Sequence, residues 1–160
     1  MAVALAAIDR LFQALVAICI CIIVVSVTAD VVARYGLRHS IMVVNELSRL
    51  SFIWVAFLVM PLAIGRGMHV AITGLETRLR PRVRKVAYRA SLMLIGVFMG
   101  FLLVSAIISI RDRSGEAMLT MPLAVSWFFV PIALGAAHSI LHLIAEFIRG
   151  ERTVRAVEFE

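Results

Sequence analysis

Three side chains near the C-terminal end of the sequence are the ones best suited to bind a metal ion or a haem. His138, His142 and Glu146 follow one another at intervals of four residues, so a helix would place them on one face. Two histidines on one helical face cannot bind opposite sides of a single haem, and a zinc ion needs one or two further ligands at the same depth. No such ligand is evident in the sequence. We therefore expect these residues to make polar packing contacts, without a metal or cofactor.

A second group of polar residues lies just before the apolar stretch 51–64. Glu46 and Arg49 are three residues apart, a spacing at which opposite charges pair on a helix, and Asn45 is a suitable residue to cap the helix start. Trp54 follows slightly deeper. Two interpretations remain open. The charged residues form an ion pair at the membrane surface, or they make a polar contact with another helix or another subunit.

Other arrangements that could carry out catalysis are absent from the sequence. There is no glycine-rich phosphate loop, no Ser/His/Asp set and no group of metal ligands at a characteristic spacing. No carboxylate stands in the middle of an apolar run, where a proton-driven exporter usually needs one. Asp30 and Arg34 are expected to form a solvated pair of little energetic value. The sequence therefore predicts no catalytic residue and no enzymatic activity.

The elements that position these residues follow from the composition. Of 160 residues, 62% are apolar and 16% are charged, and the mean hydropathy is +1.02. A soluble domain of this size has too little interior to bury so much apolar surface. Four apolar runs without strand-like alternation predict an all-α integral membrane protein with four transmembrane helices, forming one domain over residues 1–160. The expected spans are residues 11–30, 45–64, 86–110 and 123–148.

The charge pattern predicts partners and direction. The net charge is +6, but the bases lie between apolar runs, which favours membrane lipids and not a nucleic acid as the partner. With four spans, one side of the membrane carries eleven Lys and Arg residues and the other carries five, so both termini are predicted to be cytoplasmic. The residues expected to anchor the middle loop to anionic lipid headgroups are Arg78, Arg80, Arg82, Arg84 and Lys85.

Prolines and glycines suggest further features of the helices. Pro61 and Pro131 fall inside the second and fourth expected spans, where each is predicted to kink its helix. Pro122 is expected in the first turn of the fourth helix. Gly96 and Gly100 form a small-xxx-small pattern in the third span and are candidates for close helix packing.

Several short segments of the sequence together follow the pattern of a known family of membrane proteins. They are Asn45-Glu46-Leu47-Ser48-Arg49, Phe52-Ile53-Trp54, Ala63 to Arg66, His69-Val70, Met121-Pro122 to Trp127 with Pro131, and Leu141-His142-Leu143. In these segments the sequence resembles the small membrane subunits of tripartite ATP-independent periplasmic (TRAP) transporters. One position departs from the pattern. The family often has an aspartate four residues after the histidine, and Thr73 stands there in this sequence, so no role of that carboxylate is carried over.

The resemblance implies a supporting role in a three-part uptake system of the bacterial inner membrane. A periplasmic binding protein would deliver a small organic acid to a large permease subunit, which takes it up in symport with sodium. The small subunit would pack against the large one. Candidate polar contacts between helices or subunits are Glu46, Arg49 and Trp54, followed by Arg66 and His69. Two alternative functions are a self-sufficient small exporter of the multidrug type and a haem-binding membrane redox subunit.

Overall fold

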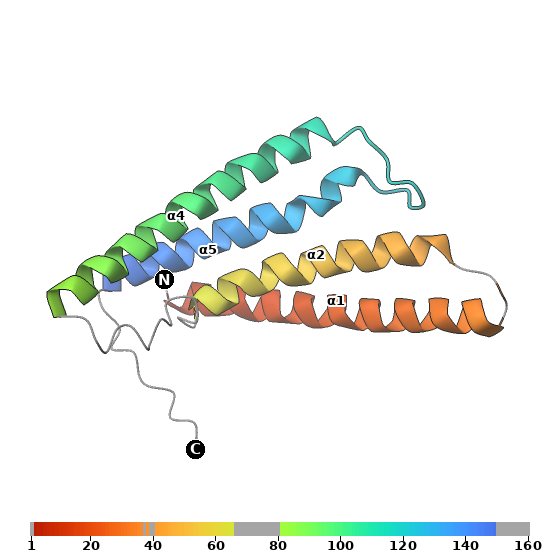
Figure 1. Ribbon diagram of the computed structural model, residues 1–160, viewed down its shortest axis with the longest axis horizontal. Coiled ribbons are helices and arrows are strands. Elements are labelled where there is room, and N and C mark those ends of the chain that lie inside the picture. The colour runs from red at the N-terminus through yellow and green to blue at the C-terminus, as the bar shows by residue number, and fades with distance from the viewer. Residues whose placement is uncertain (1, 37, 39–40, 66–80, 150–160) are drawn as a thin grey trace, which may run out of the picture.

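The computed structural model describes residues 2–36, 38, 41–65 and 81–149, which form helices and their connections (Figure 1). The prediction of an all-α fold with four helices long and apolar enough to cross a membrane is confirmed for this part of the chain. The helices are α1 (Ala2–Gly36), α2 (Met42–Gly65), α4 (Pro81–Asp112) and α5 (Val130–Arg149), with a short 3-10 helix, η1 (Val125–Phe128), before α5.

Three of the four helices are longer than the apolar runs that predict them. α1 begins at Ala2, because Asp9 and Arg10 lie within its first turns without ending it. α2 begins at Met42, so Asn45 lies inside the helix and is not its cap, contrary to the prediction. With 24 residues, α2 is about 36 Å long at 1.5 Å per residue, which is enough for a ~30 Å bilayer core.

The start of α5 also differs from the prediction. Pro122 lies in a hairpin-like loop and not in a helix, because Ala117 pairs with Ala124 and the amide of Met118 donates to the carbonyl of Leu123 at 2.8 Å. The helix begins only at Val130, so Pro131 occupies its first turn and not its interior. In the first turn, the missing amide of Pro131 removes no intrahelical hydrogen bond, so Pro131 gives no reason for the predicted kink in α5. Pro61 does lie inside α2, as expected.

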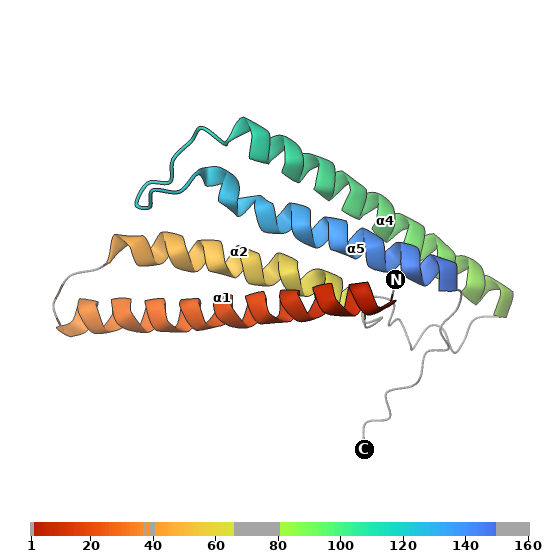
Figure 2. The same cartoon turned by 180° about the vertical axis from the view of Figure 1, so that it is seen from behind.

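The four helices form a row in the order α1, α2, α5, α4, as Figures 1 and 2 show from opposite sides. α1 packs against α2, α2 against α5, and α5 against α4. The start of α1 and the end of α5 lie at one end of the row, which we call the terminal end. The end of α1, the start of α2 and residues 113–124 lie at the other end, the loop end, where the α1–α2 and α4–α5 pairs diverge.

The two halves of the row meet where α5 crosses α2. A Cβ atom on Gly135 would lie 2.2 Å from the carbonyl oxygen of Phe57, so only glycine allows the two backbones to approach this closely. Ser139, one turn further along α5, and Leu58 on α2 are 0% exposed. Gly135 and Ser139 therefore form a small-xxx-small pair on the buried face of α5, with Gly135 at the close approach to α2.

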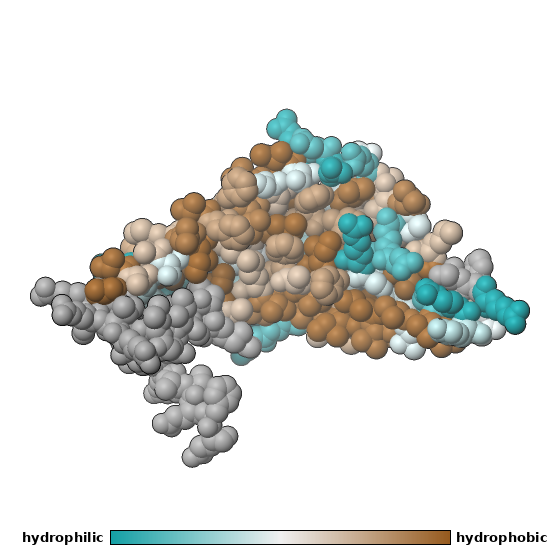
Figure 3. Space-filling model, viewed as in Figure 1, coloured by the Kyte–Doolittle hydropathy of each residue, from teal (hydrophilic) through white to brown (hydrophobic). Residues whose placement is uncertain are grey.

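Most of the apolar surface of the row faces outward. In the apolar windows of α1 and α4 only 11% of residues are buried, against 39% in α5. Large exposed side chains of α4 include Met93, Leu94, Val97, Phe98 and Phe101. Figure 3 shows hydrophobic colour along the helices, with the described hydrophilic residues on this face gathered mainly at the loop end. A surface of this kind is suited to lipid or to another membrane protein.

Candidate functional site

Glu46 joins α2 to the loop that precedes α5. Its carboxylate accepts hydrogen bonds from the backbone amides of Leu119 at 3.1 Å and Thr120 at 2.8 Å, and from the Thr120 hydroxyl. The two residues lie more than 70 positions away in the sequence. In the described part of the chain, Glu46 therefore contacts another segment of its own chain and does not pair with Arg49.

Arg49 and Trp54 extend the same contact toward η1. The guanidinium carbon of Arg49 lies 5.7 Å from the centre of the Phe128 ring, within the range of a cation–π interaction. The indole Nε1–H of Trp54 donates to the carbonyl of Trp127 at 3.3 Å, and the two indole rings stack with centres 6.2 Å apart. Together with Glu46, these residues connect α2 to residues 119–128, and we call the group the loop-end cluster.

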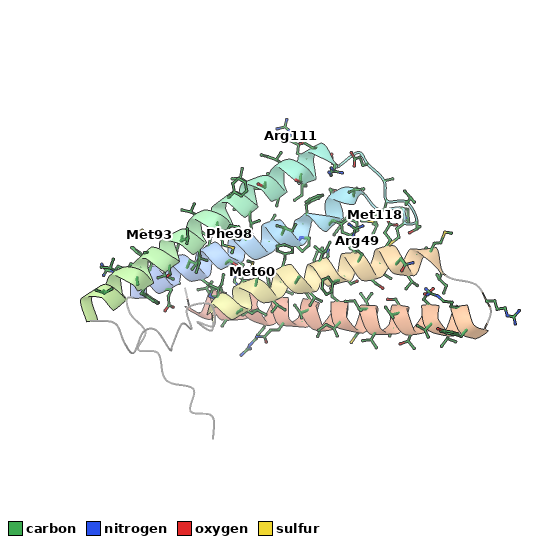
Figure 4. All side chains as sticks on the ribbon, in the orientation of Figure 1. Arg49, Met60, Met93, Phe98, Arg111 and Met118 are labelled. Atoms are coloured by element: carbon green, nitrogen blue, oxygen red, sulfur yellow. The ribbon has the colours of Figure 1, made fainter. Side chains whose placement is uncertain are left out.

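A cavity of about 540 Å³ opens beside the loop-end cluster, where the two helix pairs diverge. Figure 4 shows Arg49 of α2 and Met118 of the loop in this gap. The lining combines charged groups with apolar ones: Glu46, Arg49, Ile53, Arg113, Ala117, Met118, Leu119, Val125, Phe128, Phe129 and Ile132. Arg113 pairs with Glu116 at 3.2 Å, and Arg49 is exposed. The lining of the cavity is therefore of mixed polarity, with two arginines and one glutamate among mainly apolar side chains.

Asp30 connects α1 to the start of α2. Its carboxylate pairs with Arg34 and accepts a hydrogen bond from the amide of Ile41 at 2.9 Å. Asp30 is buried, which contradicts the prediction of a solvated pair. The burial follows from the position of Asp30 beside the start of α2, where the free amide of Ile41 donates to the carboxylate. Further along the same contact, the hydroxyls of Ser26 and Ser48 lie 3.2 Å apart.

A second polar cluster lies at the terminal end and contains Asp9, His138 and His142. The Oδ1 atom of Asp9 is 2.7 Å from Nε2 of His138 and 2.9 Å from Nε2 of His142, and the two Nε2 atoms are 3.2 Å apart. His138 is 3% exposed, His142 11% and Asp9 28%. The cluster connects α1 to α5 across the end of α2.

Sequence reasoning missed Asp9, and the statement that no further metal ligand lies at the depth of the histidines is wrong. Asp9, His138 and His142 offer three ligand atoms within 4.8 Å of one another. The number of spans could have pointed to Asp9. With four spans, the start of the first helix and the end of the fourth lie on the same side of the membrane, so Asp9 and the two histidines share that side. Glu146 accepts instead from the hydroxyl of Tyr88 at 2.9 Å and so contacts α4.

The arrangement of the histidines bears on the haem alternative. Two Fe–N bonds of about 2 Å on opposite sides of a haem would place the nitrogens ~4 Å apart and pointing at each other across the ring. Here the two Nε2 atoms are 3.2 Å apart on one helix and converge on Asp9. This pair of histidines cannot hold a haem between them.

The remaining predicted site residues lie elsewhere. A Cβ atom on Gly96 or Gly100 would meet nothing within 4 Å, so within the described chain no other helix packs on these glycines. A contact with a partner there stays a prediction. Arg66, His69, Arg78 and Arg80 fall outside the described residues, as do the side chains of Arg82, Arg84 and Lys85.

Four apolar helices in an open row, with polar clusters that join the chain's own helices, define a multi-pass membrane protein. The sequence comparison then gives its family. The chain belongs to the tripartite ATP-independent periplasmic transporters, DctQ component, which it matches over residues 23–153. It is also similar to a protein of Haemophilus influenzae whose name describes a TRAP transporter small permease, with 40% identity over 72 residues. That match spans 43% of this chain and 45% of the relative, less than half of each.

Proposed function

We propose that this chain is the non-catalytic small subunit of a TRAP transporter and supports a large permease subunit during sodium-driven uptake of a small organic acid. The family match over residues 23–153 is the observation that carries the proposal. In this proposal, a periplasmic binding protein delivers the acid, the large subunit moves it, and this chain transports nothing alone.

The open row of helices supports a structural role. A permease that moves part of itself through the membrane needs a frame that does not tilt. α1 and α4 each leave a long apolar face exposed, which gives the row a large area for contact with lipid and with a partner. Within the described residues, the carboxylates of the helices lie near helix ends, as Asp9, Asp30, Glu46 and Glu146 do. This placement favours a supporting subunit over a self-sufficient proton-driven exporter.

Gly96 and Gly100 of α4, the candidates for close helix packing, are proposed to contact the large subunit. Their surface is open in this chain, and small residues in lipid allow a second helix to approach closely. Replacing Gly100 by Leu should reduce co-purification of the large subunit while the isolated chain keeps its stability. Gly36→Leu is a matched control, because a Cβ atom there also meets nothing within 4 Å but the residue lies at the end of α1.

We further propose that the protein lies in the bacterial inner membrane with its terminal end in the cytoplasm. The excess of Lys and Arg on that side supports this direction. The loop end, with Glu46, Arg49 and Trp54, would then be periplasmic and available to the binding protein. A cysteine at Ser114, introduced in a chain lacking Cys19 and Cys21, should react with a membrane-impermeant maleimide in intact spheroplasts. Reaction only after lysis would reverse the orientation.

Reconstitution tests the function as a whole. The chain is co-expressed with the large TRAP subunit of its own genome, purified through a tag on this chain, and placed in liposomes with an inward sodium gradient. Uptake of a labelled organic acid should need this chain, the large subunit and the binding protein together. Full uptake without this chain, or uptake by this chain alone, would contradict the proposal.

A further inference from the structure

We propose that Asp9, His138 and His142 form a binding site for a divalent transition-metal ion, with zinc as the best match. The site would take one carboxylate oxygen and two imidazole nitrogens from the protein. This donor set is typical of zinc, which binds histidine nitrogen and carboxylate oxygen in tetrahedral sites. The inference is independent of the transport function proposed above, because it rests on the side chains of the terminal end alone.

The distances between the ligand atoms fit a zinc ion after a small adjustment. Bonds of about 2.0–2.1 Å in a tetrahedral site place neighbouring ligand atoms ~3.3 Å apart. The two Nε2 atoms are already 3.2 Å apart. The carboxylate oxygen, at 2.7 and 2.9 Å from them, would retreat by roughly half an ångström, which a rotation of the Asp9 side chain supplies.

The two histidines are held in place by their surroundings. Their spacing of four residues puts both rings on one face of α5, as in helical zinc motifs. Phe12 of α1 packs on the His138 ring, with ring centres 4.8 Å apart. On the other side, a Cβ atom on Gly65 would lie 2.8 Å from Cε1 of His142, so glycine leaves just enough room for that ring. A prearranged pair of this kind loses little freedom when an ion binds.

The three ligand atoms converge on one point. All three lie within 3.2 Å of one another, and both Nε2 atoms face the same Oδ1 atom. A metal ion at this point would bind one lone pair of each atom. The partial exposure of Asp9 leaves one side open, so water would complete a three-ligand site.

The Nδ1 atom of His138 bears on how tightly the site should bind a metal ion. The buried Nδ1 of His138 has no hydrogen-bond partner in the described structure. Metal-binding histidines usually donate this N–H to an acceptor, which strengthens the bond to the metal. We therefore expect weaker binding than at structural zinc sites that have such an acceptor. An ion bound here would connect α1 directly to α5, which are not neighbours in the row.

Metal content of the purified full chain tests the site. The protein in detergent is stripped with a chelator, incubated with Zn²⁺, desalted and analysed by mass spectrometry for zinc per chain. Affinity is then measured by competition with a coloured chelator. Wild type should bind one zinc per chain. Asp9→Asn and His142→Gln should each weaken binding beyond the about 10- to 100-fold that loss of an outer-shell partner causes.

The controls are the other two histidines of the chain, His39 and His69, each replaced by Gln. Both should bind one zinc with wild-type affinity. Zinc should also raise the unfolding temperature of wild type and of the two controls, but not of Asp9→Asn. Less than stoichiometric zinc on wild type, or equal affinity in wild type and a triple variant of Asp9, His138 and His142, would overturn the proposal. The wild-type measurement decides even where a variant fails to fold.

Discussion

The crossing of α2 and α5 allows a sharp test of the fold, through the substitution Gly135→Ala. The added methyl group would lie 2.2 Å from the carbonyl oxygen of Phe57, whereas ordinary contacts begin at 3.4 Å. The two backbones would have to separate by roughly 1 Å, and overpacking of this kind costs about 1–3 kcal/mol. The higher helix propensity of alanine offsets about 1 kcal/mol. We expect a net loss of up to about 2 kcal/mol.

Two matched substitutions separate packing from helix propensity. Gly96→Ala and Gly100→Ala make the same chemical change in α4, where a Cβ atom meets nothing within 4 Å. Both should leave the stability of the isolated chain unchanged or increase it. Unfolding is followed in mixed micelles by titration with a denaturing detergent and by tryptophan fluorescence, because Trp54 stacks on Trp127 beside the crossing. If Gly135→Ala is as stable as the two controls, the close approach of α2 and α5 is incorrect.

Three further predictions address the polar contacts. Glu46→Gln should speed hydrogen exchange at residues 119–120, since one acceptor oxygen becomes an amide nitrogen that cannot accept from those amides; unchanged exchange by mass spectrometry would contradict the contact. Asp30→Ala should lower the free energy of unfolding by about 1 kcal/mol, because the amide of Ile41 loses its acceptor, and equal stability in the micelle titration would oppose this account. Tyr88→Phe should cost only about 0.6 kcal/mol, a typical value for an interhelical hydrogen bond in membranes, and a loss above ~2 kcal/mol would show that the hydroxyl does more.

The number and type of helices could be predicted from the sequence because hydropathy alone determines them. The long apolar runs have no other stable state in lipid than helices. Helix ends were harder to predict. Asp9 and Arg10 interrupt the hydropathy but not the backbone hydrogen bonds, so α1 continues through them to Ala2. The start of α5 depends on the loop hydrogen bonds around Ala117, which apolar patterns do not encode.

Contacts between helices were predicted less well, because they depend on how the helices are aligned along their axes. The small-xxx-small pattern occurs at Gly96 and Gly100 and also at Gly135 and Ser139. Among the residues that the structure describes, Gly135 packs against α2, whereas Gly96 and Gly100 meet no other helix. Sequence spacing cannot choose between them. The contact between Asp9 and the histidines of α5 was missed for a similar reason. Whether Asp9 lies level with His138 depends on how α1 and α5 are aligned in the folded protein, which the sequence does not reveal.

The hydrogen bonds of the Glu46 carboxylate affect how the α1–α2 and α4–α5 pairs respond to a force along the helix axes. Apolar helices in a bilayer slide along one another at little cost, because lipid tails replace any contact that is lost. Glu46 instead holds two backbone amides and a hydroxyl of the loop before α5 through directional hydrogen bonds. Axial slippage between α2 and this loop would break all three bonds at once, so the contact should resist sliding of the two halves past each other when a neighbouring protein pushes on either one.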